Sequence, residues 1–201
     1  MSLYNPTKNF IFIHIPKCGG TSMESLGWIG EGFNKHYDIK FFKDTYENTK
    51  DFDFDKVFKF CFVRNPYDRF ASGVLGHALP SNKLEVLLGT MGKDEAKKID
   101  TERFRAFATT NRENFDKIVA IRPQHSFVTI DGKMVMDFVG RFENLQDDFN
   151  TLCDRFGFNR TELPHMVKGR YNKYDSFYTP EIREIVADHY SKDFEMFGYG
   201  K

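Results

Sequence analysis

The stretch that decides the fold is FIFIHIPKCGGTS, residues 10–22. Its apolar, β-branched start is typical of a buried strand, which we expect over residues 9–15, closed by a proline. Two adjacent glycines follow, and then a short expected helix. A strand, a glycine-containing turn and a helix start together favour an anion site, because backbone N–H groups converge there and glycine permits close approach. Lys17 can add a full positive charge, and Thr21 and Ser22 add hydroxyl donors.

A second strand is expected over residues 57–63, in the sequence VFKFCFV, and it ends at Arg64. The sequence NPYDRFASGVLGH then opens a helix, with Asn65 as the cap and Pro66 at the first helical position. Strands that alternate with helices predict a three-layer α/β fold with a central, mostly parallel sheet flanked by helices. The length predicts a single domain over residues 1–201.

The rest of the chain contains five further expected segments. They are a polar, aromatic-rich connection over 30–56, an inserted helical region over 81–114, a hairpin over 127–142, a helix over 145–156 and a last helix over 179–197. Asp131–Gly132 suits the hairpin turn. Gly157 suits the end of the fourth segment, and Thr179 suits the cap of the last.

Composition narrows the class of protein. Hydrophobic residues make up 40% and charged residues 29%, which is typical of a globular chain. The net charge is zero, from 29 basic and 29 acidic residues, and this argues against a nucleic-acid partner. The three cysteines, Cys18, Cys61 and Cys153, are too scattered for a disulfide framework or a zinc site. No apolar stretch approaches the roughly 18 residues that span a membrane, so we expect no membrane partner and a cytoplasmic location.

The first stretch departs from the phosphate loop of nucleotide kinases. In that loop the lysine follows the glycines, whereas Lys17 precedes Gly19 and Gly20. The second expected strand ends at Arg64, where a magnesium-binding acid would be expected in a kinase. Transfer from a nucleoside triphosphate needs Mg²⁺ to screen crowded charge. A sulfuryl group carries less charge than a phosphoryl group. A lysine and backbone N–H donors could therefore stabilise its transfer without a metal ion.

These motifs resemble those of the sulfotransferases that use 3′-phosphoadenosine 5′-phosphosulfate (PAPS). HIPKCGGTS followed by FVRNPYDRFASG is similar to the paired signature of the carbohydrate type, family 2, related to heparan 2-O- and chondroitin sulfotransferases. DFVGRFENLQDDF and the closing YTPEIREIVADHYSKDFEMFGY also resemble that family. The resemblance spans residues 10–199 and implies a P-loop-like fold, PAPS as the donor, no required metal and a hydroxyl-bearing acceptor such as a saccharide. Because the membrane anchor and paired cysteines of the animal enzymes are missing from this sequence, a compact microbial or viral version is the expectation.

The resemblance implies a role for each matching position. The first motif would bind the 5′-phosphosulfate through Pro16, Lys17, Cys18, Gly19, Gly20, Thr21 and Ser22, with Lys17 also stabilising the leaving group. Arg64 and Ser72 would bind the 3′-phosphate. A late basic loop would close over the nucleotide through Lys168, Gly169 and Arg170. Arg141 is a further candidate, which could face the cofactor or pair with Glu143.

The reaction also needs a base for the proton of the acceptor hydroxyl, and histidine is the usual choice near neutral pH. In the related 2-O enzymes the histidine lies between the two phosphate motifs, where this chain has His36. His36 is therefore the first candidate, His125 the second and His77 the third. Glu24 is an alternative carboxylate base, although a carboxylate there could simply complement the helix dipole. His14 is expected to pack at the end of the first strand.

Two other classes of function stay open at this point. A nucleotide-dependent kinase with a divergent loop would bind ATP tightly and require Mg²⁺. A binding module that keeps the nucleotide site without a base would bind the product 3′-phosphoadenosine 5′-phosphate (PAP) without turnover. The sequence names neither the acceptor nor the oligomeric state.

Overall fold

The structure is a computed structural model that describes residues 4–27, 36–50, 52–79, 89–164 and 173–201. The chain divides into two compact units. Unit one comprises residues 1–64 and 124–167, and unit two comprises residues 65–123 and 168–201. The units are described separately below, and the single domain expected from the sequence stays a prediction.

Unit one contains the central sheet. Its strands are β1 (Tyr4–Asn5), β2 (Phe10–Ile13), β3 (Phe58–Val63) and β6 (Phe138–Arg141), in the order β1-β2-β3-β6. β1 is antiparallel to β2, whereas β2, β3 and β6 are parallel. In the register Ile13 lies opposite Cys61 and Val63 lies opposite Arg141. The carboxyl ends of the three parallel strands therefore meet at one edge of the sheet, which we call the carboxyl edge.

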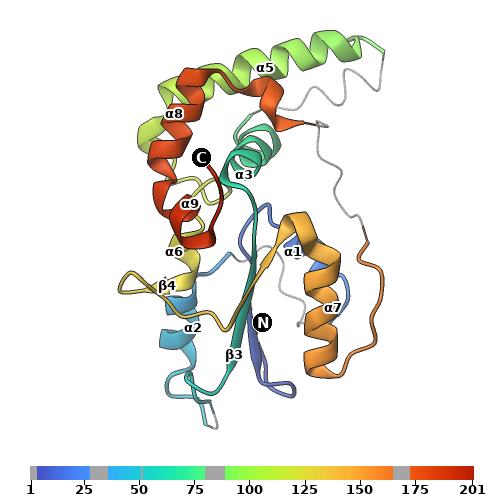
Figure 1. Cartoon of the computed structure of the whole chain (residues 1–201), viewed down its shortest axis with the longest axis vertical. Helices are drawn as coiled ribbons and strands as arrows, with labels where there is room; N and C mark the ends of the chain where they lie inside the picture. The colour runs from blue at the N-terminus through green and yellow to red at the C-terminus, as the bar shows by residue number, and fades with distance from the viewer. Residues whose placement is uncertain (1–3, 28–35, 51, 80–88, 165–172) are drawn as a thin grey trace. The chain divides into compact units, whose positions relative to one another are not determined.

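Helices flank both faces of this sheet. α7 (Leu145–Phe156) and α2 (Ile39–Tyr46) lie on opposite sides of β3 (Figure 1). On the α7 side, the rings of Phe10 and Phe156 pack with their centroids 4.7 Å apart. α1 (Gly20–Glu24) follows β2, and α6 (His125–Val128) precedes a hairpin of β4 (Thr129–Ile130) and β5 (Lys133–Met134). The predicted α/β class, with a mostly parallel sheet between helices, is confirmed.

Unit two is helical and has an aromatic core. Its helices are α3 (Pro66–Gly73), the π-helical turn η1 (Val74–Ala78), α5 (Lys93–Thr110), the 3₁₀ turns η2 (Arg112–Asn114) and η4 (Tyr174–Phe177), α8 (Pro180–His189) and α9 (Ser191–Phe197). The buried rings of Phe70, Phe104 and Tyr190 belong to one apolar cluster. The Tyr190 hydroxyl donates to the Ile121 carbonyl at 2.5 Å, and burial raises the pKa of Tyr190. Paired in this way, the phenol can be buried without losing its hydrogen bond.

Several expected element boundaries are confirmed. The Asn65 side chain accepts the backbone N–H groups of Tyr67 and Asp68 at the start of α3, and Thr179 caps α8 in the same way. Gly157 ends α7 in the left-handed conformation, with φ 69°. Glycine is favoured at such a position because it has no Cβ to clash.

Three expectations about the remaining segments were wrong in part. The 30–56 connection contains α2, whose first turn is capped by the Asp38 carboxylate accepting from Phe41 N–H. The hairpin turn at Asp131–Gly132 is correct, but the hairpin ends at Met134, and 138–141 joins the main sheet as β6, parallel to β3. The last helix breaks at Tyr190, because this residue leaves helical geometry to join α8 to α9.

Candidate active site

The turn after β2 has an unusual backbone. Lys17 and Gly19 both occupy the left-handed region, with φ 70° and 84°. A non-glycine residue rarely adopts this conformation, and such residues concentrate at functional sites. A Cβ on Gly19 would also lie 2.7 Å from Leu145 Cδ2. Left-handed residues in a turn direct neighbouring backbone N–H groups into a concavity that suits an anion.

Gly20 is required by its contact with His14. A Cβ at Gly20 would lie 2.1 Å from His14 Cδ2, which no side chain tolerates without displacement. His14 is buried, as expected for the end of β2, and its Nδ1 lies 2.7 Å from Glu24 Oε1. Glu24 stands at the last residue of α1, not in its first turn as expected, because α1 begins at Gly20. Its carboxylate therefore holds the His14 ring beneath the turn.

Arg64 lies at the carboxyl end of β3 and reaches back to the first motif. Its Nη1 donates to the Lys17 carbonyl at 3.0 Å. The guanidinium carbon lies 4.1 Å from the centre of the Phe142 ring, a cation–π contact that orients the side chain. Arg64 is partly exposed. The structure thus brings together two of the predicted donor-binding residues, Lys17 and Arg64, at the carboxyl edge.

Gln124 joins the same two loops, and the sequence interpretation missed it. Its side chain is fully buried. Gln124 Oε1 accepts from Arg64 N–H at 2.9 Å and from the Cys18 thiol at 3.3 Å, while Nε2 donates to the Arg64 carbonyl at 2.9 Å. Two of these partners are backbone atoms of a residue 60 positions away, so no spacing in the sequence signals the contact.

His36 is placed beside the end of β2. Its Nδ1 lies 2.9 Å from the backbone carbonyl of His14, and the two imidazole rings meet nearly perpendicularly with centroids 4.5 Å apart. A carbonyl oxygen only accepts, so Nδ1 carries the hydrogen. In the neutral ring Nε2 is then the nitrogen that can take up a proton. The contact therefore fixes the tautomer of the neutral ring.

Three other residues of the first motif differ in their surroundings. Cys18 is buried, and its thiol also points to the Pro16 carbonyl at 3.6 Å, so it packs inside the turn. Thr21 is exposed. The Ser22 hydroxyl donates to the Pro164 carbonyl at 2.7 Å. Cys18 can therefore offer an anion only its backbone N–H, and Pro16 has no N–H to offer.

The remaining predicted residues are spread over the chain. His125 is the half-buried first residue of α6, and Arg141 is the exposed last residue of β6. The Arg141 N–H donates to Asp148 Oδ2 at 2.6 Å. Ser72 lies in α3 and His77 in η1, both in unit two. The prediction for Lys168, Gly169 and Arg170 falls outside the described residues.

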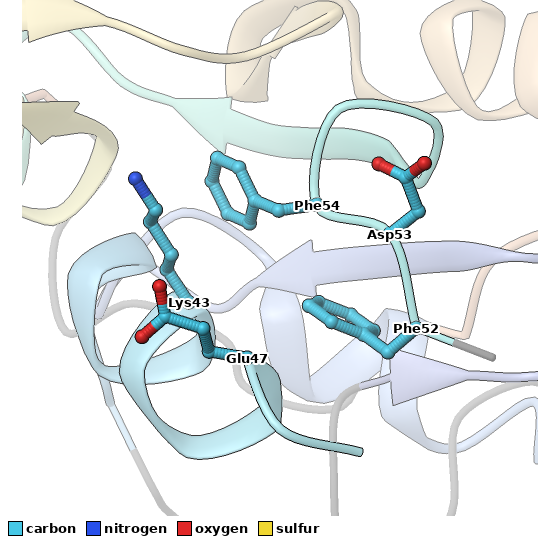
Figure 2. A pocket seen from close by; sticks show the side chains of 5 residues that line it. All are labelled: Lys43, Glu47, Phe52, Asp53 and Phe54. Atoms are coloured by element: carbon cyan, nitrogen blue, oxygen red, sulfur yellow. The ribbon is translucent and has the colours of Figure 1, made fainter. Parts of the chain in front are cut away.

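A separate surface hollow of about 260 Å³ lies elsewhere in unit one. It is lined by Lys43, Glu47, Phe52, Asp53 and Phe54 (Figure 2). Lys43 belongs to α2 and Glu47 follows its last residue; Lys43 Nζ lies 5.5 Å from the centre of the Phe54 ring. The lining residues 52–54 precede the start of β3, whereas Lys17 and Arg64 follow the ends of β2 and β3. Ligands of parallel sheets bind at the carboxyl ends of strands, so this hollow is not the candidate active site.

Within the described ranges, no group of three or more histidine, cysteine, aspartate or glutamate side chains could hold a metal ion. Among those same residues, no helix has both the length and the apolar character needed to cross a membrane.

Comparison with known proteins gives one match. No curated protein and no solved structure matches the chain. A family model described as "Sulfotransferase family" matches residues 1–200 and so covers nearly the whole sequence. The match includes the turn at Lys17, the end of β3 at Arg64 and the segment that carries Gln124. This chain belongs to the sulfotransferase family.

Proposed function

We propose that the protein transfers a sulfuryl group from PAPS to a hydroxyl group of an acceptor and releases PAP. The observation that carries the proposal is the family match over residues 1–200, which supports sulfuryl transfer in general. The convergence of Lys17 and Arg64 at the carboxyl edge supports PAPS as the donor, because both residues are cations beside a turn built for an anion.

The residues of the turn fit the phosphosulfate of this donor. Gly19 and Gly20 add no side chain of their own to the turn, and the left-handed Lys17 and Gly19 orient the neighbouring backbone N–H groups. Lys17 adds the charge that an anionic ligand needs. We assign the 5′-phosphosulfate to residues 16–22, through the backbone N–H of Cys18 and the side chains of Lys17 and Thr21. Ser22 joins them once its hydroxyl, which here donates to the Pro164 carbonyl, turns to the ligand. Pro16 has no backbone N–H and could touch the ligand only through its ring.

The 3′-phosphate is assigned to Arg64 together with Ser72. An arginine can meet a phosphate with two parallel N–H donors, which gives strength and fixed geometry. Arg64 is partly exposed and oriented by Phe142, which favours this role. The assignments of Ser72, of Arg141, and of Lys168, Gly169 and Arg170 rest on the family resemblance.

His36 is proposed as the general base. Its Nδ1–H donates to the His14 carbonyl, which leaves Nε2 as the acceptor of the hydroxyl proton. His125 is the second candidate for this role. Lys17 is proposed to stabilise the negative charge that develops on the departing phosphate. PAPS supplies the sulfuryl group, and the contribution of the chain is positioning and electrostatic stabilisation.

The acceptor is proposed to be a saccharide or another small hydroxyl compound. Tyr37 follows His36 directly, and its ring stacks on Phe41 with centroids 3.8 Å apart. Phe41 is 40% exposed, which is unusual for so large an apolar side chain. The half-buried Tyr37 and the exposed Phe41, which follow the proposed base in the sequence, would offer the apolar face of a sugar ring an aromatic surface. An acceptor screen should therefore begin with saccharides.

Calorimetric titrations with PAP and with ATP, each with and without Mg²⁺, test the proposal. We expect PAP to bind without a metal ion, and transfer from PAPS to follow once an acceptor is found. Metal-dependent ATP binding without PAP affinity would overturn the proposal in favour of a kinase. PAP binding with no transfer to any acceptor would instead identify a binding module.

A further inference from the structure

We propose that Gln124 is a positioning residue of the donor site, which holds the Cys18 turn and the Arg64 end of β3 in one fixed arrangement. The inference rests on the proposed function, because it concerns how the PAPS-binding residues are held. It goes beyond that function, because Gln124 does not belong to either phosphate motif.

The contacts of Gln124 match its amide group atom by atom. The oxygen faces two donors, Arg64 N–H and the Cys18 thiol, and the nitrogen faces an acceptor, the Arg64 carbonyl. This pattern fixes the amide orientation, since in the flipped orientation the amide NH₂ would face the Arg64 N–H, and two donors would meet. The side chain is 0% exposed, so water cannot replace these hydrogen bonds. A buried amide that lost its partners would be costly, which makes the arrangement well defined.

The position of Arg64 explains why such a side chain is needed. The pairing of β3 with β6 ends at Val63 opposite Arg141. The pairing of β3 with β2 ends earlier, at Cys61 opposite Ile13. Arg64 therefore lies beyond the ladder of the sheet, and its backbone N–H and carbonyl need partners from elsewhere. Gln124 supplies both partners.

Fixing the backbone of Arg64 also limits where its guanidinium can lie. The same amide oxygen holds Cys18, which stands between the left-handed residues Lys17 and Gly19. Loss of the Gln124 amide should loosen both loops together. Small displacements of ligand-binding groups strongly reduce affinity and rate, because the site is no longer preorganised for its ligand.

The amino end of β3 provides a matched control. There the Asp137 carboxylate accepts from Lys59 N–H at 2.8 Å, and Asp137 N–H donates to the Lys59 carbonyl at 2.8 Å. Asp137 thus also makes two hydrogen bonds to the backbone of one residue near a strand end, one through its carboxylate and one through its own N–H, at the edge away from Lys17 and Arg64. Asp137→Ala should lower stability without changing the donor site.

The experiment measures PAP affinity by calorimetry, and thermal stability in parallel, for the full chain and four variants. These are Gln124→Leu, Asp137→Ala, Arg64→Ala and the double variant Gln124→Leu/Arg64→Ala. We expect Gln124→Leu to weaken PAP binding about tenfold, and Asp137→Ala to weaken it less than about twofold at a similar loss of stability. In the Arg64→Ala background the Gln124→Leu effect should shrink, because the two residues act through one arrangement. If Gln124→Leu fails to fold, Gln124→Asn keeps a polar amide but is too short to reach both loops at once, and the same weakening is expected.

Three outcomes would overturn the inference. They are unchanged PAP affinity in Gln124→Leu, an equal loss in Asp137→Ala, and effects of Gln124→Leu and Arg64→Ala that simply add. Each of them leaves the proposed function standing, because the unmodified chain still binds PAP. Absence of PAP binding by the unmodified chain would overturn the proposed function and the inference together.

Discussion

The two ends of β3 hold a cation in different ways. At the amino end, Lys59 is 5% exposed, and its ammonium donates to the Phe54 and Val57 carbonyls at 3.1 and 2.7 Å. The Asp137 carboxylate lies 3.2 Å away and balances the charge. At the carboxyl end, Arg64 is only partly buried, and its guanidinium lies on the Phe142 ring beside the Lys17 carbonyl.

This difference supports a structural role for Lys59 and the proposed binding role for Arg64. Lys59 is buried, satisfied by oxygens and paired with a carboxylate, which suits a structural role. Arg64 keeps part of its surface toward solvent, at the edge where parallel sheets bind ligands and beside a left-handed turn. We therefore expect changes at the amino end to lower stability, and changes at the carboxyl end to lower binding and rate.

The largest expected effect is that of Lys17→Ala on catalysis. Removing a charge that stabilises the leaving group should slow sulfuryl transfer about a thousandfold. PAP binding should persist, because the backbone groups of the turn stay in place. Single-turnover transfer from PAPS to an acceptor found by screening measures the rate. Lys43→Ala, in the hollow of Figure 2, is the matched control and should transfer at the normal rate. Equal rates for Lys17→Ala and the unmodified chain would remove Lys17 from the mechanism.

The next largest effect is expected for His36→Ala. Loss of a general base should slow transfer about a hundredfold, with PAP affinity unchanged because the base faces the acceptor. The same transfer assay, combined with PAP titration, separates the two quantities. His125→Ala serves as the comparison. A slow His125→Ala variant beside a fast His36→Ala variant would transfer the role of base to His125.

A smaller effect is expected for Gly20→Ala on stability. The new Cβ would lie 2.1 Å from His14 Cδ2 and would displace the ring that Glu24 holds. Overpacking of this kind should cost about 2 kcal/mol of the free energy of unfolding, measured by urea denaturation. Gly200→Ala, which meets no atom within 4 Å, should change that free energy by less than about 0.5 kcal/mol. Similar values for both variants would mean that the turn can rearrange freely.

The elements that the sequence predicted well are those with local signals. Asn65–Pro66, Thr179–Pro180 and Gly157 each carry a capping or stopping function within a few residues, and all three appear at the expected helix ends. α2 was missed although its buried residues, Ile39 and Phe42, recur at helical spacing. The exposed Phe41 between them made the segment look like an aromatic-rich connection. β6 was misplaced because strand pairing with β3 is a long-range contact that a hairpin-like sequence does not reveal.

The residues of the candidate site also differ in whether a local sequence signal points to them. Lys17, Gly19, Gly20 and Arg64 could be proposed from motifs, and the structure brings the turn and the end of β3 together. Gln124 and Phe142 could not, because their partners are a distant backbone and a side chain brought near only by the fold. The tautomer of His36 is likewise set by the His14 carbonyl, which lies 22 positions away in the sequence.

The most direct test compares the two ends of β3 in one measurement series, with PAP affinity and the free energy of unfolding determined for Arg64→Ala and Lys59→Met. We predict that Arg64→Ala weakens PAP binding about a hundredfold, because a hydrogen-bonded charge pair is lost, while stability changes by less than about 1 kcal/mol. We predict the reverse for Lys59→Met: a loss of about 2 kcal/mol in stability, from carbonyls left unsatisfied, with PAP affinity unchanged. Equal PAP affinity in Arg64→Ala and the unmodified chain would contradict the assignment of the carboxyl edge as the donor site.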